Sequence, residues 1–216
     1  MKTKYLIILL SVCITACSGN KTKENSKKLP SRMEYLYSIE KALLVADKVD
    51  TLRLSGLSLE TISDDIVKLK NLRCLYLGDN PKVDYAKALI NICKLENLEE
   101  LDLTGDQIKS LPKEIGNLKN LKALWIGANP ELDLKDVFDK LKGLKNLKEL
   151  TISFNEKEEI PENISLLQNL EILYLDGNSL KTLPSSLKEL KKLNTLSLIS
   201  NPGLDLKNVL TNLKDC

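Results

Sequence analysis

The chain of 216 residues contains no histidine, and only 4% of its residues are aromatic. Histidine is the commonest general base and the commonest zinc ligand, so its absence removes the most frequent starting points for catalysis and for a zinc site. The chain also lacks a large net charge, because its 32 Lys and Arg residues nearly balance its 30 Asp and Glu residues. A nucleic-acid-binding surface needs clustered basic residues, so we expect no nucleic-acid partner.

Long hydrophobic runs are scarce. The longest, YLIILLSVCITA, covers residues 5–16 and follows Lys2 and Lys4. A membrane-spanning helix needs about 20 apolar residues, so a positive start and a short apolar run indicate a secretory signal instead. We therefore predict a signal peptide at residues 1–16.

The signal ends in Ile14, Thr15, Ala16 and Cys17, which resembles the lipobox of bacterial lipoproteins. The resemblance implies cleavage before Cys17, acylation of that cysteine, and attachment to a membrane of the bacterial cell envelope through this lipid anchor. Ser18 resembles the sorting signal for the outer membrane. The alternative is an ordinary signal peptide with a chance cysteine.

Residues 17–31 follow as a lipidated cysteine and a polar, lysine-rich segment without apolar periodicity, which we interpret as a flexible tether. Next, residues 32–48 carry apolar side chains at helical spacing. They predict an amphipathic helix that caps the first repeat. Its apolar positions are Met33, Leu36, Ile39, Leu43 and Ala46.

Residues 49–216 contain the pattern L-x-x-L-x-L-x-x-N in seven copies, spaced by 23 or 26 residues. This pattern resembles the leucine-rich-repeat family, and the short copies resemble the 23-residue repeats typical of bacteria and of intracellular scaffold proteins. The resemblance implies an α/β solenoid: a curved array with a parallel concave β-sheet and loops and short helices on the convex side. The copies open at Val49, Leu72, Leu98, Leu121, Leu147, Leu170 and Leu193.

Each predicted strand alternates, so its leucines face one side and its other residues face the opposite side. One repeat cannot bury its leucines alone, whereas stacked repeats form a continuous core. The terminal Asn of each copy can bond to turning backbone that would otherwise be buried unpaired. The predicted ladder is Asn80, Asn129, Asn155, Asn178 and Asn201, with Asp106 as a near-substitute and Leu57 as an exception. The longer copies predict a convex helix, with apolar positions at Leu134, Val137, Phe138, Leu141 and Leu144.

The only tryptophan, Trp125, lies between Leu124 and Ile126, so we predict that it points onto the concave face. Tyr76 and Tyr174 hold the same position two repeats away, which places the rings about 10 Å apart. An exposed row of rings with carboxylates indicates a binding surface, although the rings could instead only pack on one another. The predicted ligand-binding residues are Tyr76, Glu100, Asp102, Trp125, Glu149, Thr151, Tyr174 and Asp176. Small residues beside them are Gly78, Thr104, Gly127 and Ser153.

The segment SFNEKEEIPENI departs from the repeat. Phe154 stands where other copies have Gly105 and Gly177, and Lys157 stands where they have an aliphatic residue. Four glutamates lie nearby, at Glu156, Glu158, Glu159 and Glu162. Either this repeat forms an acidic contact loop, or Phe154 repacks to fill the gap and the charges are solvated; we favour the repacking.

The cysteines do not suggest a disulfide framework. Cys74 lies on a predicted concave strand and Cys93 on the convex side, and Cys216 is either free or pairs between molecules.

Catalytic motifs are missing as well as histidine: there is no Gly-rich phosphate loop, zinc spacing or nucleophile motif. We expect no enzyme activity, no metal and no cofactor. The favoured function is an envelope lipoprotein that binds a protein or peptide, or a glycan, on its concave face. One alternative is a structural scaffold that holds a partner protein at the envelope. Another is an intracellular signalling scaffold, if the lipobox is fortuitous. The oligomeric state stays open.

Overall fold

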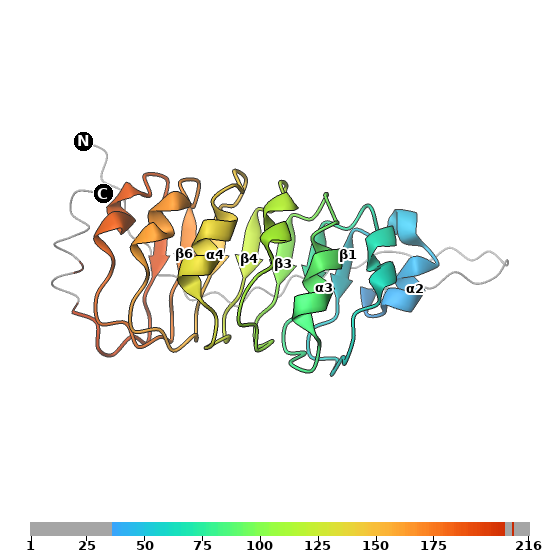
Figure 1. The fold of residues 1–216 in the computed structure, drawn as a ribbon, viewed down its shortest axis with the longest axis horizontal. Coiled ribbons are helices and arrows are strands. Elements are labelled where there is room, and N and C mark those ends of the chain that lie inside the picture. Colours follow the sequence, from blue (N-terminus) through green and yellow to red (C-terminus); the bar gives the residue numbers. More distant parts are fainter. Residues whose placement is uncertain (1–35, 206–208, 210–216) are drawn as a thin grey trace, which may run out of the picture.

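A computed structural model describes residues 36–205 and residue 209. The predicted signal peptide, Cys17, the tether, Met33 and Cys216 lie outside the described residues. Within them, the chain forms a single curved array of repeats with strands along one side and helices along the other (Figure 1).

Seven strands form one parallel sheet in chain order, as the seven repeats predict. They are β1 (Thr51–Arg53), β2 (Cys74–Tyr76), β3 (Glu100–Asp102), β4 (Ala123–Trp125), β5 (Glu149–Thr151), β6 (Ile172–Tyr174) and β7 (Thr195–Ser197). The register is in step throughout, so Leu101 pairs with Leu124 and Asp102 with Trp125. Equivalent residues of successive repeats therefore form straight columns across the sheet.

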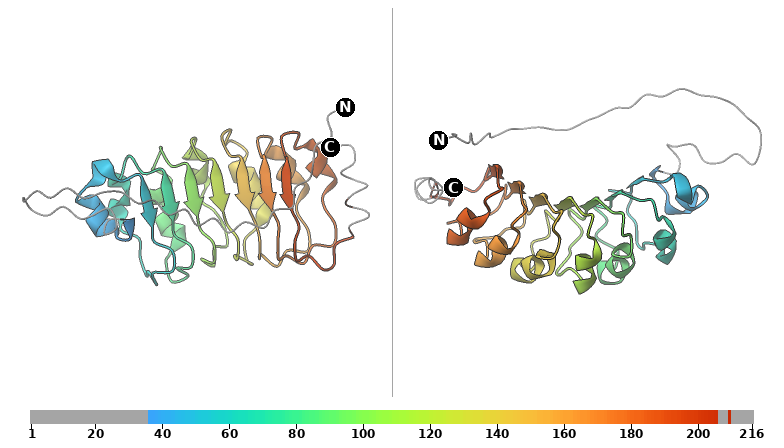
Figure 2. Two further views of the ribbon diagram at one scale, coloured as in Figure 1. Left: turned by 180° about the vertical axis from the view of Figure 1, so that it is seen from behind. Right: turned by 90° about the horizontal axis from the view of Figure 1, so that it is seen from above.

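The convex side carries one short helix for each of the first six repeats, as seen from above in Figure 2. The two complete 26-residue copies form α-helices, α3 (Tyr85–Ile92) and α4 (Leu134–Leu141). The shorter copies have room only for single 3-10 turns: η2 (Asp64–Lys68), η3 (Lys113–Asn117), η4 (Glu162–Leu166) and η5 (Ser185–Glu189). Asp84 and Asp133 start the α-helices by accepting backbone N–H bonds. The predicted apolar face of α4 is confirmed, and its members are all buried.

The leucine core fills the space between strands and helices. Leu124 and Ile126 are fully buried, whereas Trp125 between them is half-buried on the concave face. The predicted alternation is therefore confirmed. The strands are only three residues long, but the parallel bonding continues past their ends, where the Ile126 N–H donates to the Thr151 carbonyl at 3.0 Å.

The predicted asparagine ladder is buried, and the amide of every member donates to backbone of the preceding repeat. The Nδ2 of Asn129 donates to the carbonyls of Leu103 and Gly127, each at 2.9 Å. Its Oδ1 accepts the N–H groups of Asp106 at 3.2 Å and Ile108 at 2.9 Å. Each ladder residue thus joins its own turn to the preceding repeat and satisfies backbone groups that no water reaches.

A second asparagine row, which we did not predict, joins the repeats on the opposite edge. The residue before the first leucine of a copy donates through Nδ2 to a backbone carbonyl of the preceding copy. The sequence signal is the recurring Asn-Leu that opens the copies. The row comprises Asn71, Asn97, Asn120 and Asn146.

The capping helix predicted over residues 32–48 is broken within its described part, residues 36–48. There the chain forms α2 (Ile39–Leu43) and then a 3-10 turn, η1 (Ala46–Lys48). Ser38 has extended backbone and accepts the Lys41 N–H, so a continuous helix cannot pass through it. The buried side chains are Ile39, Ala42 and Val45. The predicted positions Leu36, Leu43 and Ala46 are only half-buried.

Asp106 replaces asparagine in the ladder and is 2% exposed. Its Oδ1 accepts the Asn80 N–H at 2.7 Å, while its buried Oδ2 has no hydrogen-bond partner within the described chain. The hydroxyl of Tyr85 donates to the Leu77 carbonyl at 3.4 Å nearby. Burial raises the pKa of Asp106 to about 7, helped by the negative charges of Asp102 and Asp79; the bond from the Asn80 N–H and the nearby Tyr85 hydroxyl oppose the rise.

This raised pKa makes stability depend on pH. The folded chain holds a proton on Asp106 between about pH 4 and pH 7, where the unfolded chain does not. The contribution of Asp106 to the free energy of unfolding is therefore fully present below pH 4. It declines as the pH rises from 4 to 7, by at most about 1.4 kcal/mol for each pH unit.

We predict that Asp106→Asn removes this component, because the amide cannot ionise and its Nδ2 can donate where Oδ2 has no partner. The variant should gain stability over the parent at pH 8 relative to pH 5, by about 3 kcal/mol, since two pH units separate pH 5 from the folded pKa. Urea denaturation of both proteins at the two pH values measures this difference. An equal difference at both pH values would show that Asp106 ionises normally.

Candidate concave binding face

The structure brings all eight predicted ligand-binding residues onto the concave face, which Figure 2 shows from behind. Tyr76, Asp102, Trp125, Thr151 and Tyr174 occupy consecutive places in one column. Glu100 and Glu149 lie in the column beside it, and Asp176 follows β6 on the other side. Each of the eight is half-buried.

Tyr76 and Trp125 stack on each other, with ring centroids 6.1 Å apart and an angle of 28° between planes. The predicted separation of about 10 Å is therefore wrong for this pair. The side chain between them, Asp102, is short, so the two rings approach each other across it. Burial raises the pKa of Asp102, while its bond from the Thr104 N–H at 3.0 Å opposes this rise.

Arg53 extends this stack at its N-terminal end. Its guanidinium carbon lies 4.8 Å from the centroid of the Tyr76 ring, within the range of a cation–π interaction. We did not predict this contact, although Arg53 occupies the same column in the first repeat. The row of rings therefore already holds one cation.

Carboxylates hold the polar tips of both stacked rings. The Tyr76 hydroxyl donates to Glu100 Oε2, and Trp125 Nε1 donates to Glu149 Oε1 at 2.9 Å. Burial, followed by the bond to Glu100, raises the pKa of Tyr76 well above its ordinary value. Aromatic side chains fixed at both face and tip lose little entropy when a ligand binds.

Tyr174 stands apart from the stack. Thr151 separates it from Trp125 in the register, and no ring contact joins the two among residues 36–205. Burial raises the pKa of Tyr174, and the negative charges of Glu149 and Asp176 add to the rise. Both carboxylates therefore lie near the Tyr174 side chain.

The glycines beside the row are required by packing between repeats. A Cβ on Gly127 would lie 2.7 Å from the Ser153 carbonyl oxygen, and one on Gly78 would lie 2.9 Å from the Thr104 carbonyl oxygen. Both distances are shorter than van der Waals contact. Their small size therefore follows from the fold, whatever ligand binds.

Phe154 is 62% exposed, so the predicted repacking of this side chain is wrong. Its φ of 59° lies in the left-handed region, as do the φ values of Gly105 and Gly177 in the same column. A bulky residue is disfavoured there by about 1–2 kcal/mol. The ring covers Gly177, where an added Cβ would lie 2.3 Å from it. An exposed ring on unfavourable backbone suggests a functional role.

The charged residues after Phe154 are held by neighbouring repeats. Glu158 pairs with Lys181, and Glu162 accepts the N–H groups of Ser185 and Ser186. Lys157 donates through Nζ to the Pro130 carbonyl at 2.7 Å, and burial lowers its pKa. Its stem takes the place of the missing aliphatic residue.

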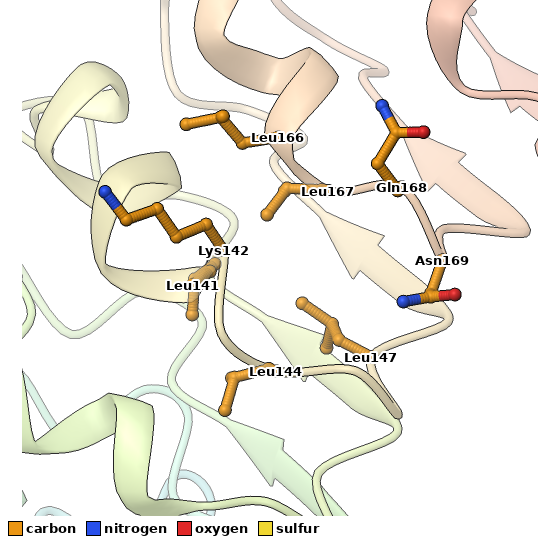
Figure 3. A pocket seen from close by; sticks show the side chains of 8 residues that line it. All are labelled: Leu141, Lys142, Leu144, Leu147, Leu166, Leu167, Gln168 and Asn169. Carbon is orange, nitrogen blue, oxygen red and sulfur yellow. The ribbon is translucent and has the colours of Figure 1, made fainter.

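No enclosed cavity offers a rival site in the described part of the chain. A space of about 10 Å³ lies on the convex side between α4 and η4, lined mainly by leucines (Figure 3). It has room for no more than one water molecule. Two larger depressions, lined by residues such as Arg73 and Glu99 or Lys94 and Asn117, are open to solvent.

Residues 36–205 contain neither a group of side chains placed to bind a metal ion nor a helix able to cross a membrane. No group of three or more Cys, Asp or Glu side chains there is placed to hold a metal ion. None of the helices in this range has the length and apolar content needed to cross a bilayer. Cys74, half-buried in β2, and Cys93, buried after α3, are free thiols.

Comparison with known proteins agrees with the geometry. A family profile described as Leucine Rich Repeat matches residues 169–190. Among solved structures, internalin C2 of Listeria monocytogenes is 26% identical at a TM-score of 0.56, over 77% of each chain. The fold is a leucine-rich-repeat solenoid.

Two further solved structures are similar to this chain. A leucine-rich-repeat protein of Leptospira interrogans is 26% identical at a TM-score of 0.46, and the match covers 82% of this chain but 62% of that one. The Toll–Spatzle complex of Drosophila is 22% identical at a TM-score of 0.54, over 70% of this chain and 22% of that one. The curated proteins contain no match.

We predict that Phe154→Gly stabilises this solenoid, because glycine adopts the left-handed backbone without strain. The gain should be about 0.5–1 kcal/mol after the extra entropy of glycine in the unfolded chain is subtracted. Urea denaturation measures it. Ala128→Gly is the matched control, since Ala128 has a φ of 51° in the same column. A loss of stability in Phe154→Gly would mean that the ring supports the fold.

Proposed function

We propose that the protein binds a protein or peptide partner on its concave face, at a bacterial cell envelope. The observation that carries this proposal is the row of half-buried rings whose tips are held by Glu100 and Glu149. Tyrosine and tryptophan supply much contact area at low entropy cost and dominate binding hot spots. A rigid row of such residues on an open sheet is suited to an extended partner surface.

Phe154 supports the same function. Its ring is exposed at the turn that follows β5, beside the column of Asp176. The backbone strain at this position leaves most of the ring in solvent, with only its contact over Gly177 covered. Contact with a partner would supply the missing burial, so we include Phe154 in the proposed binding surface.

The concave face is acidic, and this charge bears on which class of ligand it binds. Glu100, Asp102, Glu149 and Asp176 lie on it, and the only basic residue in its central column is Arg53. A glycan, which could stack on flat ring faces, finds one face of Trp125 already covered by Tyr76. A protein or peptide is therefore favoured over a glycan.

The envelope location rests on the sequence, where Cys17 ends a lipobox-like motif after a short apolar run. The multiple acylation that the lipoprotein resemblance implies would give a lasting anchor, since several chains hold a membrane stably and one does so only marginally. The 23-residue class of the short repeats, typical of bacteria, agrees with this location.

The function is tested by capturing partners from envelope extract and titrating the identified partner against variants. Tyr76→Ala, Trp125→Ala and Tyr174→Ala should each weaken binding by about 2 kcal/mol, roughly thirty-fold. Trp125→Ala should cost most, because it also frees Tyr76 and Glu149. Phe154→Gly should weaken binding while it stabilises the fold. Lys188→Ala, on the exposed convex side, is the control. Unchanged binding by the triple aromatic variant would favour the scaffold alternative.

The anchor is tested separately with Cys17→Ser. This variant should incorporate no palmitate in metabolic labelling, because the acceptor sulfur is gone. Leu9→Ala, a change within the apolar run, serves as the labelled control. Palmitate on the Cys17→Ser protein would refute the lipoprotein assignment and leave the binding proposal intact.

A further inference from the structure

The N-terminal part of the concave row, around Tyr76, contacts a cation of the chain itself, whereas the C-terminal part, from Trp125 to Tyr174, does not within residues 36–205. We define the acidic aromatic patch as Trp125, Glu149, Thr151, Tyr174 and Asp176. Thr151 pairs with Trp125 on one side and with Tyr174 on the other. The Cα atoms of the two aromatic residues are therefore about 10 Å apart, two strand spacings.

At the N-terminal end, the row is complete within the chain. The guanidinium of Arg53 lies on the Tyr76 ring, Glu100 accepts the Tyr76 hydroxyl, and the other side of the ring stacks on Trp125. A cation, an aromatic face and a carboxylate are thus assembled there from three repeats.

The acidic aromatic patch has two of these three components. It has rings and carboxylates, but no Lys or Arg in residues 36–205 forms an ion pair with Glu149 or Asp176. Nor does any cation in that range lie over Trp125 or Tyr174. The acidic aromatic patch therefore resembles the group formed by Arg53, Tyr76 and Glu100, but it has no cation of its own in the described part of the chain.

Acceptor atoms in the patch are left without donors. Glu149 uses Oε1 to hold Trp125, and Asp176 uses Oδ1 to accept from Ser197 and the Ile199 N–H. No described residue donates to Glu149 Oε2 or Asp176 Oδ2. The hydroxyl oxygen of Thr151 is buried and also has no partner. Half-buried acceptors without donors favour a ligand that carries several N–H groups and a positive charge.

We propose that the acidic aromatic patch binds a cationic side chain, arginine or lysine, of the partner protein. The cation would lie against the Trp125 and Tyr174 rings and donate to Glu149 Oε2 and Asp176 Oδ2. The guanidinium of arginine fits best, because its planar fork can stack on a ring and donate to carboxylates at once. This inference rests on the proposed function and adds the chemistry that the partner must present.

The test uses Trp125 as the reporter, since it is the only tryptophan in the chain. The protein is titrated with the peptide acetyl-Gly-Arg-Gly-amide, while its tryptophan fluorescence is followed. The matched probe replaces arginine with citrulline, which keeps the shape and removes the charge. A neutral sugar, maltotriose, is the third probe. We expect a saturable change with the arginine peptide that weakens as salt increases, and little change with the other two.

Variants locate the site. Glu149→Gln and Asp176→Asn should weaken arginine-peptide binding by about 3- to 30-fold, the range of a desolvated cation–π and carboxylate contact. Glu189→Gln is the matched control: it removes the same charge from an exposed glutamate of η5, on the convex side and away from the patch. It should leave the affinity unchanged. Thermal unfolding of each variant separates binding from folding.

The outcomes are distinct. Equal binding of the arginine and citrulline peptides, preference for maltotriose, no fluorescence response, or an equal effect of Glu189→Gln and Glu149→Gln would each overturn the cation proposal. If the identified partner still loses affinity with Trp125→Ala, the concave binding function stands without it. Failure of the aromatic variants to affect the partner overturns the proposed function itself.

Discussion

The buried asparagine ladder is the interaction on which the rest of the structure depends. Every repeat must turn its chain between a strand and the convex side, and this turn leaves backbone groups inside the core. An asparagine amide presents two donors and an acceptor, and in Asn129 they reach its own turn and the preceding repeat together. Because the same bond set recurs, neighbouring repeats are held at one spacing and in one register.

That register produces the binding face. Each three-residue strand points its first and third residues outward and the leucine between them inward, and the in-step pairing places equivalent residues directly beside each other. A ring in every second repeat then lies close enough to stack across a short residue, as Tyr76 and Trp125 do over Asp102. The carboxylates of the adjacent column reach the ring tips for the same reason. Rigid repeats thus hold the rings in place before any partner binds.

Departures from the repeat divide into two physical kinds. Asp106 keeps the ladder's acceptor but loses its donor, so burial raises the pKa of this carboxyl and couples it to pH. Phe154 keeps the left-handed turn but adds a ring where the other repeats have glycine or a smaller side chain, so strain accompanies exposure. The first departure changes the core, whereas the second changes the surface beside the acidic aromatic patch. Only the second presents new chemistry to a partner.

The sequence by itself determined the repeat register, the leucine core, the asparagine ladder and the identity of the concave column. These follow from local periodicity, since each repeat places Leu124 inward and Trp125 outward by the same alternation. The short 3-10 turns and the α-helix at Leu134–Leu141 follow from repeat length. Only the tertiary structure decided how side chains from different repeats meet. The Tyr76–Trp125 stack, Arg53 on Tyr76 and Phe154 over Gly177 join residues 23 or more positions apart, through rotamers that no sequence pattern specifies. The break at Ser38 likewise depends on a competition between capping and helix continuation that apolar spacing does not reveal.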